Sequence, residues 1–276
     1  MTIKQFIYFE GMRKTVIEMK NDSGAPSQIQ ITGTNISNLV FAQVWLGEVI
    51  EGHQFIRSLE KETEKWTFSL ATMNHPLHAP GNIRTDSSEF KLALCRASTR
   101  RALQKILWIS EVKKVVWIGY SLGFWSIFQA LCTMDKDPKI KGILAKSGIH
   151  SYERILLRFL GKYGYPQNKP QAWAQLFKEF QMDETSWIWQ MPVLPDNPIP
   201  MHRNFLRWAR NLKEQSWCPY DLECWHGTYD HWSTPEDITT LSPRKIHTFE
   251  LWHSLRPNRD INRAIFAAAE KIFIAD

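Results

Sequence analysis

Apolar residues along the chain follow two kinds of pattern, short continuous runs and longer segments with helical spacing. Four runs have the length and composition of strands, and the first of them is continuous and apolar, as expected of a strand buried on both faces: 38–42, 66–71, 115–118 and 140–146. Residues 124–134 repeat apolar positions three and four apart, and Asp86 with Glu89 has capping-box spacing at the start of a predicted helix over 87–106. Strands that alternate with helices predict an α/β fold with a mostly parallel central sheet and helices on both faces.

The first part of the chain has short strand-like runs without helices between them. Residues 6–9 and 15–19 are separated by Gly11, and a polar turn follows at 21–27. This pattern predicts a leading antiparallel edge before the inner strand at 38–42.

Two further strands and a helix are predicted near the C-terminus. Residues 222–225 and 245–252 are the predicted strands, and residues 259–273 are the predicted helix. The spacing of its apolar residues predicts that the helix packs these against the sheet: Ile261, Ile265, Ala268 and Ile272.

The length and composition predict one core domain with an insertion. The chain has 276 residues, of which 43% are hydrophobic, so it can bury a large core. Residues 1–146 and 218–276 form the predicted core, and 147–217 form a predicted helical cap. The cap segment holds five tryptophans, which could line an apolar pocket or form the core of the cap itself: Trp173, Trp187, Trp189, Trp208 and Trp217.

The run at 115–118 leads directly into Gly119-Tyr120-Ser121-Leu122-Gly123 and then into a helical pattern. A serine on a sharp strand-to-helix turn projects its hydroxyl above the sheet edge, and flanking glycines relieve the crowding of that turn. An ordinary turn with two incidental glycines is the alternative. Because strand, turn and helix occur in the required order, the pattern favours a nucleophile elbow with Ser121 as the nucleophile.

From this turn, the order of elements over roughly residues 36–275 resembles the α/β-hydrolase fold superfamily. The resemblance implies that an Asp or Glu and then a His follow the serine along the chain, each after a strand. Asp230, in the Gly-x-x-Asp run at 227–230, matches the acid, and His253, at the end of the last predicted strand, matches the histidine. Asp221, which precedes a strand, and Asp237, at a helix start, are the competing acids.

The resemblance also implies a role for each residue. His253 would take the hydroxyl proton of Ser121, and Asp230 would fix the tautomer of that histidine and stabilise its charged form. Backbone N–H groups of Leu122 and Trp45 would stabilise the oxyanion, with Val44 competing for the second position. The family commonly has His-Gly where this chain has Gln43-Val44, and a β-branched residue adopts fewer backbone conformations than glycine.

We therefore expect a serine hydrolase that cleaves an ester or thioester with an apolar acyl group through an acyl-enzyme. Acyltransferases and other hydrolases use the same triad, and a non-catalytic ligand-binding protein of this fold is the alternative from another class. The expected partner is a small-molecule acyl substrate without a cofactor. Arginines at helical spacing could bind the phosphate of a carrier-linked substrate or form a solvated face: Arg203, Arg207 and Arg210.

Charge, cysteine content and hydropathy set the remaining expectations. The net charge of +6 is scattered and lacks the aromatic interleaving of a nucleic-acid site, so no nucleic-acid partner is expected. Neither a signal-peptide core nor an apolar run of spanning length is present, which predicts a cytoplasmic protein with reduced cysteines. Cys218, Cys224 and His226 match no common zinc spacing, and His75 and His78 flank a proline, so no metal site is expected.

Overall fold

The fold was described from a computed structural model. It describes residues 3–9, 12–20, 26–44, 65–73, 92–151, 154, 158, 214–230, 233–251 and 259–275. The strands are β1 (Ile3–Phe9), β2 (Met12–Lys20), β3 (Pro26–Thr32), β4 (Asn38–Val44), β5 (Ser69–Met73), β6 (Lys114–Tyr120), β7 (Ile140–Lys146), β8 (Leu222–Gly227) and β9 (Lys245–Phe249). The helices are α2 (Leu92–Leu107), α3 (Leu122–Leu131), α8 (Pro235–Thr239) and α9 (Arg259–Ile274).

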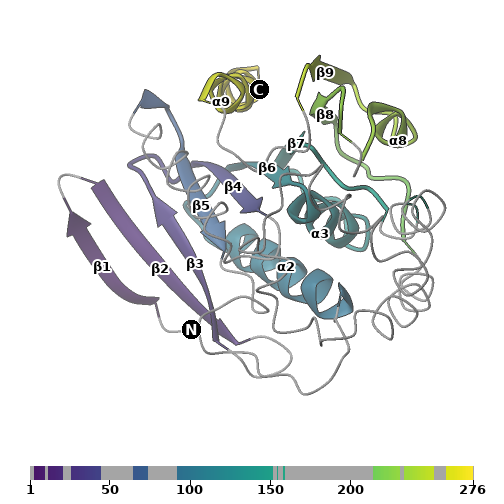
Figure 1. The fold of residues 1–276 in the computed structure, drawn as a ribbon. Helices are drawn as coiled ribbons and strands as arrows, with labels where there is room; N and C mark the ends of the chain where they lie inside the picture. Colours follow the sequence, from purple (N-terminus) through teal and green to yellow (C-terminus); the bar gives the residue numbers. More distant parts are fainter. Residues whose placement is uncertain are drawn as a thin grey trace, which may run out of the picture. The chain divides into compact units, whose positions relative to one another are not determined.

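A single sheet joins all strands of the described residues, in the order β1-β2-β3-β5-β4-β6-β7-β8-β9 (Figure 1). Strands β1, β2, β3 and β5 pair antiparallel, whereas β5, β4, β6, β7, β8 and β9 pair parallel. The leading antiparallel edge and the mostly parallel sheet predicted from the sequence are therefore confirmed.

Helices cover both faces of the parallel part of the sheet, with α3 on one face and α9 on the other (Figure 1). On β6, Gly119 faces α3, because a Cβ there would lie 2.3 Å from the Cα of Phe124. On β7, Gly142 faces α9, because a Cβ there would lie 3.4 Å from Cδ1 of Ile272. Burial from both sides explains why β4, β6 and β7 are continuous apolar runs instead of alternating ones.

Large side chains on β4 and β6 are fully buried. Phe41 and Trp117 lie on adjacent strands, in register, with their ring centroids 5.0 Å apart at an interplanar angle of 71°. Such edge-to-face pairs add about 0.5–1.5 kcal/mol to the stabilisation that burial alone gives. The strand that leads into Ser121 is therefore held by buried aromatic packing.

The predicted inner face of α9 is displaced by one residue. Ile265 is buried as predicted, but the other three predicted residues are partly exposed: Ile261, Ala268 and Ile272. Phe266 and Phe273 point inward instead, with ring centroids 5.4 and 5.9 Å from that of Phe68. Aromatic side chains bury more apolar area than aliphatic ones, so the face that carries them packs against the sheet.

The strand predicted to begin at residue 66 begins at Ser69. Trp66 stacks on Phe68 with centroids 6.0 Å apart, and the hydroxyl of Thr67 donates to Oε1 of Glu270 at 2.9 Å. These three residues therefore contact α9, and pairing with β3 and β4 starts only after them.

The chain divides into two compact units. One comprises residues 1–82, 94–150 and 215–276, and the other comprises residues 83–93 and 151–214. The predicted helical cap over 147–217 falls mostly outside the described residues and stays a prediction. Among the residues that the structure describes, no helix is long and apolar enough to cross a membrane.

Candidate functional site

Ser121 occupies the sharp turn between β6 and α3, as predicted. Its backbone angles are φ 52° and ψ −121°, a region that residues with a Cβ rarely adopt and that costs about 1–3 kcal/mol. Three backbone hydrogen bonds of 3.1 Å hold this conformation: the N–H of Ser121 donates to the carbonyl of Lys146, and its carbonyl accepts from Phe124 and Ile149. Strain held in this way is characteristic of a nucleophile elbow.

The glycine two residues before the serine is required by close packing. A Cβ at Gly119 would lie 2.3 Å from the Cα and 2.7 Å from the Cβ of Phe124, far inside van der Waals contact. The first turn of α3 can approach β6 this closely only because position 119 has no side chain. The turn that carries Ser121 therefore depends on Gly119.

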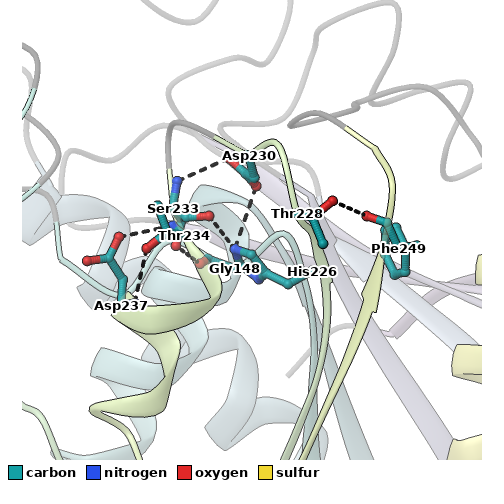
Figure 2. Close-up of polar contacts among 8 residues, drawn as sticks. All are labelled: Gly148, His226, Thr228, Asp230, Ser233, Thr234, Asp237 and Phe249. Atoms are coloured by element: carbon teal, nitrogen blue, oxygen red, sulfur yellow. Dashed lines mark hydrogen bonds and ion pairs between the residues drawn. The ribbon is translucent and has the colours of Figure 1, made fainter.

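Asp230 lies in the loop that follows β8 and is 1% exposed (Figure 2). Its Oδ1 accepts a hydrogen bond from the N–H of Ser233 at 3.1 Å. Its Oδ2 lies 3.6 Å from Nε2 of His226, a ring that is itself fully buried. That Nε2 also contacts the carbonyl oxygen of Ser233, so we assign the Nε2–H tautomer with Nε2 donating to this carbonyl. The N–H of Ser233 therefore holds the carboxylate of Asp230, and the buried ring of His226 lies beside it.

The two competing acids have other contacts. Asp221 precedes β8, at the opposite end of that strand, and its side chain is 76% exposed and 3.9 Å from Arg244. Asp237 belongs to a capping box at the start of α8, in which its Oδ2 accepts from the N–H of Thr234 at 3.0 Å (Figure 2). Asp230 is thus the one of these three acids that is both buried and at the C-terminal end of β8.

The residues that follow β7 connect the serine turn to the acid loop. The N–H of Ile149 donates to the carbonyl of Ser121 at 3.1 Å, and the hydroxyl of Ser233 donates to the carbonyl of Gly148 at 2.7 Å (Figure 2). Since Ser233 also holds Asp230, two consecutive residues fix both turns. Neither Gly148 nor Ser233 was predicted, and the only signal in the sequence was a glycine two residues after the predicted strand at 140–146.

The segment after β9 approaches the acid loop. The N–H of Thr228 donates to the carbonyl of Phe249 at 2.9 Å, and the N–H of Tyr229 donates to the carbonyl of Leu251 at 3.2 Å. Tyr229 directly precedes Asp230, and Leu251 stands two residues before His253. The backbone at Leu251 therefore runs beside the acid loop.

The remaining predicted triad and oxyanion residues are described only in part. His253 and Trp45 lie outside the described residues, and Val44 is the last residue of β4. Leu122 is the first residue of α3, where backbone N–H groups have no partner within the helix. Gln43 is buried, and its Nε2 donates to the hydroxyl of Thr99 at 3.0 Å.

Lys146, at the end of β7, is a buried cation that the sequence analysis did not identify. Its Nζ donates to Oδ1 of Asn262 on α9 at 3.3 Å and lies 5.2 Å from the ring centroid of Tyr120. Burial lowers the pKa of the Lys146 amine to about 7, because the charged form loses its hydration. The backbone carbonyl of Lys146 accepts from the N–H of Ser121. Its side chain lies on the other face of the sheet from α3, the face that α9 covers.

The histidines and cysteines outside the candidate triad do not form a metal site in the described residues. Cys218 packs against the core cluster, Cys224 is buried in the core, and His226 faces the acid loop. His247 lies on β9, and its Nε2 is 2.6 Å from Oε1 of Glu223 on the neighbouring strand β8. Several other residues considered in the sequence lie outside the described part: His75, His78, Arg203, Arg207 and Arg210.

The chain was compared with known proteins in three ways. No protein-family model matches it. No curated protein matches its sequence. Solved structures do match: an acetyl xylan esterase from Paenibacillus sp. R4 is 11% identical with a TM-score of 0.59, over 98% of this chain and 87% of that one. An esterase from Exiguobacterium antarcticum is 10% identical with a TM-score of 0.59, over 91% and 98% of the two chains. A bacterial membrane phospholipase A is 9% identical with a TM-score of 0.60, over 93% and 86%.

These similarities extend over nearly the whole chain at very low identity, so they define the fold. The chain has the α/β-hydrolase fold, with β6, Ser121 and α3 as its strand, turn and helix. The resemblance found in the sequence is confirmed at this level.

Proposed function

We propose that the protein is a serine hydrolase that cleaves an ester or thioester bond through an acyl-enzyme on Ser121. The observation that carries the proposal is the strained backbone of Ser121 at a strand-to-helix turn. Strain of this kind persists only where the surrounding structure fixes it, and it is common at catalytic residues. Three solved structures with the same fold are esterases or a phospholipase, which supports hydrolysis of an ester.

In the proposed reaction, Oγ of Ser121 bonds the acyl carbonyl carbon while His253 takes the hydroxyl proton. The tetrahedral intermediate then expels the alcohol or thiol, which receives that proton. Water, deprotonated by His253, attacks the acyl-enzyme and releases the carboxylic acid and the serine hydroxyl. Asp230 accepts a hydrogen bond from the histidine throughout and stabilises its charged form.

Two features of the acid loop support the roles of Asp230 and His253. The buried carboxylate of Asp230 accepts a hydrogen bond from the N–H of Ser233 and lies 3.6 Å from Nε2 of His226. The hydrogen bond from Tyr229 to Leu251 brings the backbone that leads to His253 against the residue before Asp230. His253 follows Leu251 by two residues, a span of at most about 7 Å, and we propose that it contacts that carboxylate.

The oxyanion is proposed to be stabilised by the backbone N–H groups of Leu122 and Trp45. Leu122 follows the nucleophile and opens α3, so its N–H points out of the helix end. Trp45 directly follows β4, the neighbour of β6 in the sheet. The positive end of the α3 dipole lies at the same place and favours a developing negative charge.

The proposed substrate has an apolar acyl group that the tryptophan-rich segment 147–217 would cover. Exclusion of water by such a cap would strengthen the electrostatic interactions of the oxyanion. As an extension of this proposal, the acyl group is linked to a carrier, and Arg203, Arg207 and Arg210 would bind the phosphate of that carrier. The cytoplasmic location stays a prediction.

Turnover of a short-chain p-nitrophenyl ester tests the proposal. Ser121→Ala is expected to lower kcat/KM by about 10³-fold or more, because the residual rate comes from binding alone. Ser126→Ala is the matched control, since Ser126 is equally buried and lies one turn further along α3. Asp230→Asn should also lower kcat strongly, whereas Asp221→Asn should not.

Two results would contradict the proposal. If folded wild-type protein has no turnover on esters or thioesters of any chain length, the ligand-binding alternative is favoured. If Ser121→Ala retains the wild-type rate, the activity belongs to another residue. If neither result is found, the rates of the wild type on esters of increasing acyl-chain length define its acyl specificity.

A further inference from the structure

The C-terminal end of α3 is fastened to residues 215–218, the segment that enters β8. The side-chain amide of Gln129 makes two hydrogen bonds of 2.8 Å with the backbone of Gln215, donating to its carbonyl and accepting from its N–H. Three residues later along α3, the thiol of Cys132 approaches the carbonyl of Trp217 at 2.8 Å. These contacts bring Cys132 against the residue that precedes Cys218.

Cys132 and Cys218 lie next to each other, because the carbonyl that accepts from the Cys132 thiol belongs to the residue directly bonded to Cys218. Both are free thiols, both are partly exposed, and both pack at the edge of the same core cluster. The neighbouring Cys132 thiol and the backbone at Tyr220 lower the pKa of Cys218, whereas the neighbouring Cys218 and burial raise the pKa of Cys132. Of the two thiols, Cys218 is therefore the one that ionises more readily.

Cys224 shows what an isolated cysteine looks like in this fold. It lies within β8, fully buried, and burial raises the pKa of its thiol because the thiolate would lose its hydration. Buried structural thiols of this kind are inert, whereas partly exposed thiols with donors around them react. Cys224 is thus an internal control for the pair.

We propose that Cys132 and Cys218 form a reversible dithiol site that low-molecular-weight disulfides oxidise to an intramolecular disulfide. The Cys218 thiolate attacks one sulfur of the disulfide, forming a mixed disulfide and releasing one thiolate, which takes a proton. The Cys132 thiol then loses its proton and attacks the Cys218 sulfur, releasing the second thiol. Two protein thiols are oxidised, and one small disulfide is reduced to two thiols.

The new bond would link two parts of the catalytic scaffold. Helix α3 begins directly after Ser121, and the segment at Cys218 leads into β8, which ends before Asp230. The disulfide would close a loop of about 85 residues that contains residues 151–214 of the second unit. The proposal does not depend on ester hydrolysis, because it rests only on the two thiols and their neighbours.

Oxidation of the folded protein by oxidised glutathione, followed by alkylation and peptide mass spectrometry, tests the proposal. The expected product is a peptide pair joined through Cys132 and Cys218 that has lost two hydrogens and is restored by dithiothreitol. Cys224 should be recovered alkylated only after denaturation, and Cys224→Ser should form the same link. Recovery of both Cys132 and Cys218 as alkylated thiols, without a link, would overturn the proposal.

The order of the two steps is tested by the rate at which iodoacetamide modifies each cysteine near pH 7. In wild-type protein, Cys218 should react several-fold faster than Cys132. Cys132→Ala removes the polar neighbour of Cys218 and should slow its modification several-fold, whereas Cys132→Ser keeps a hydroxyl at that place and should not. Equal rates for Cys218 in these two variants, or faster modification of Cys132 in the wild type, would contradict the assigned roles.

Discussion

Replacing Gly119 with alanine should separate α3 from β6 and thereby destabilise both the core and the serine turn. The added Cβ would meet three atoms of Phe124, with its Cα at 2.3 Å, its Cβ at 2.7 Å and its backbone nitrogen at 2.8 Å. Favourable carbon–carbon contacts lie near 3.5–4.0 Å, so the first turn of α3 must move by more than about 1 Å. Rotation of a side chain cannot relieve this clash, because two of the three atoms belong to the backbone.

The magnitude follows from known effects of overpacking. Inserting a methyl group into a well-packed core costs about 1–3 kcal/mol, and a clash with backbone belongs at the upper end of that range. For a domain of this size, a loss of about 3 kcal/mol lowers Tm by roughly 6 °C or more. We also expect slower reaction of Ser121 with an active-site probe, because the same movement relaxes the turn.

Gly142→Ala is the matched control on the adjacent strand β7. A Cβ there would lie 3.4 Å from Cδ1 of Ile272 and 3.5 Å from the carbonyl oxygen of Asp221, which is ordinary contact. This variant should melt within about 2 °C of the wild type, since restriction of the unfolded chain offsets any small crowding. Thermal unfolding of the three proteins decides the matter. Equal Tm values for Gly119→Ala and Gly142→Ala would refute the close approach of α3 to β6.

Two further variants test charge burial and helix capping. The pKa of Lys146 is about 7 in the folded protein and near 10.5 in the unfolded chain. Between these two pH values the unfolded chain binds more protons than the folded protein. The free energy of unfolding should therefore rise with pH across that window. This rise is about 1.4 kcal/mol per pH unit at most, and Lys146→Met should remove it when urea unfolding is compared at pH 7 and pH 9.5. If the free energy of unfolding of the variant depends on pH as in the wild type, the amine of Lys146 is not buried. Thr234→Ala removes the side chain that accepts from the N–H of Asp237 and should cost about 1 kcal/mol in the same assay, whereas no loss would contradict the cap of α8.

The features that could be predicted from the sequence are those that depend on residues close together along the chain. The run into Ser121 and the glycine at 119 predicted the strand, the turn and the helix, because the steric need for glycine is local. The Gly-x-x-Asp run likewise placed Asp230 after a strand, and Pro235 with Asp237 predicted the start of a helix, which is confirmed as α8.

Contacts between distant residues could not be predicted in this way. Ser233 and Gly148 are 85 positions apart, and only the parallel pairing of β7 with β8 brings them together. Cys132 and Cys218 meet for the same reason, although their spacing suggested no pair. A lysine in an apolar run gave no indication that Lys146 would be buried, because its partner Asn262 lies on α9, 116 positions away.

The displaced face of α9 illustrates a different limit. Apolar periodicity fixed the extent of the helix, but two overlapping faces were available, one aliphatic and one carrying Phe266 and Phe273. The choice depends on the shape of the partner, and Phe68 on the sheet favours the aromatic face. Helical periodicity therefore predicted the element and left its rotation to tertiary packing.

Covalent labelling with a fluorophosphonate probe tests the central claim most directly, because only an activated serine displaces the fluoride. We predict one adduct on folded wild-type protein, located by peptide mass spectrometry at Ser121 and absent from Ser121→Ala. Folded wild-type protein that stays unlabelled, or that carries its label on another residue, would contradict the assignment of Ser121 as the nucleophile.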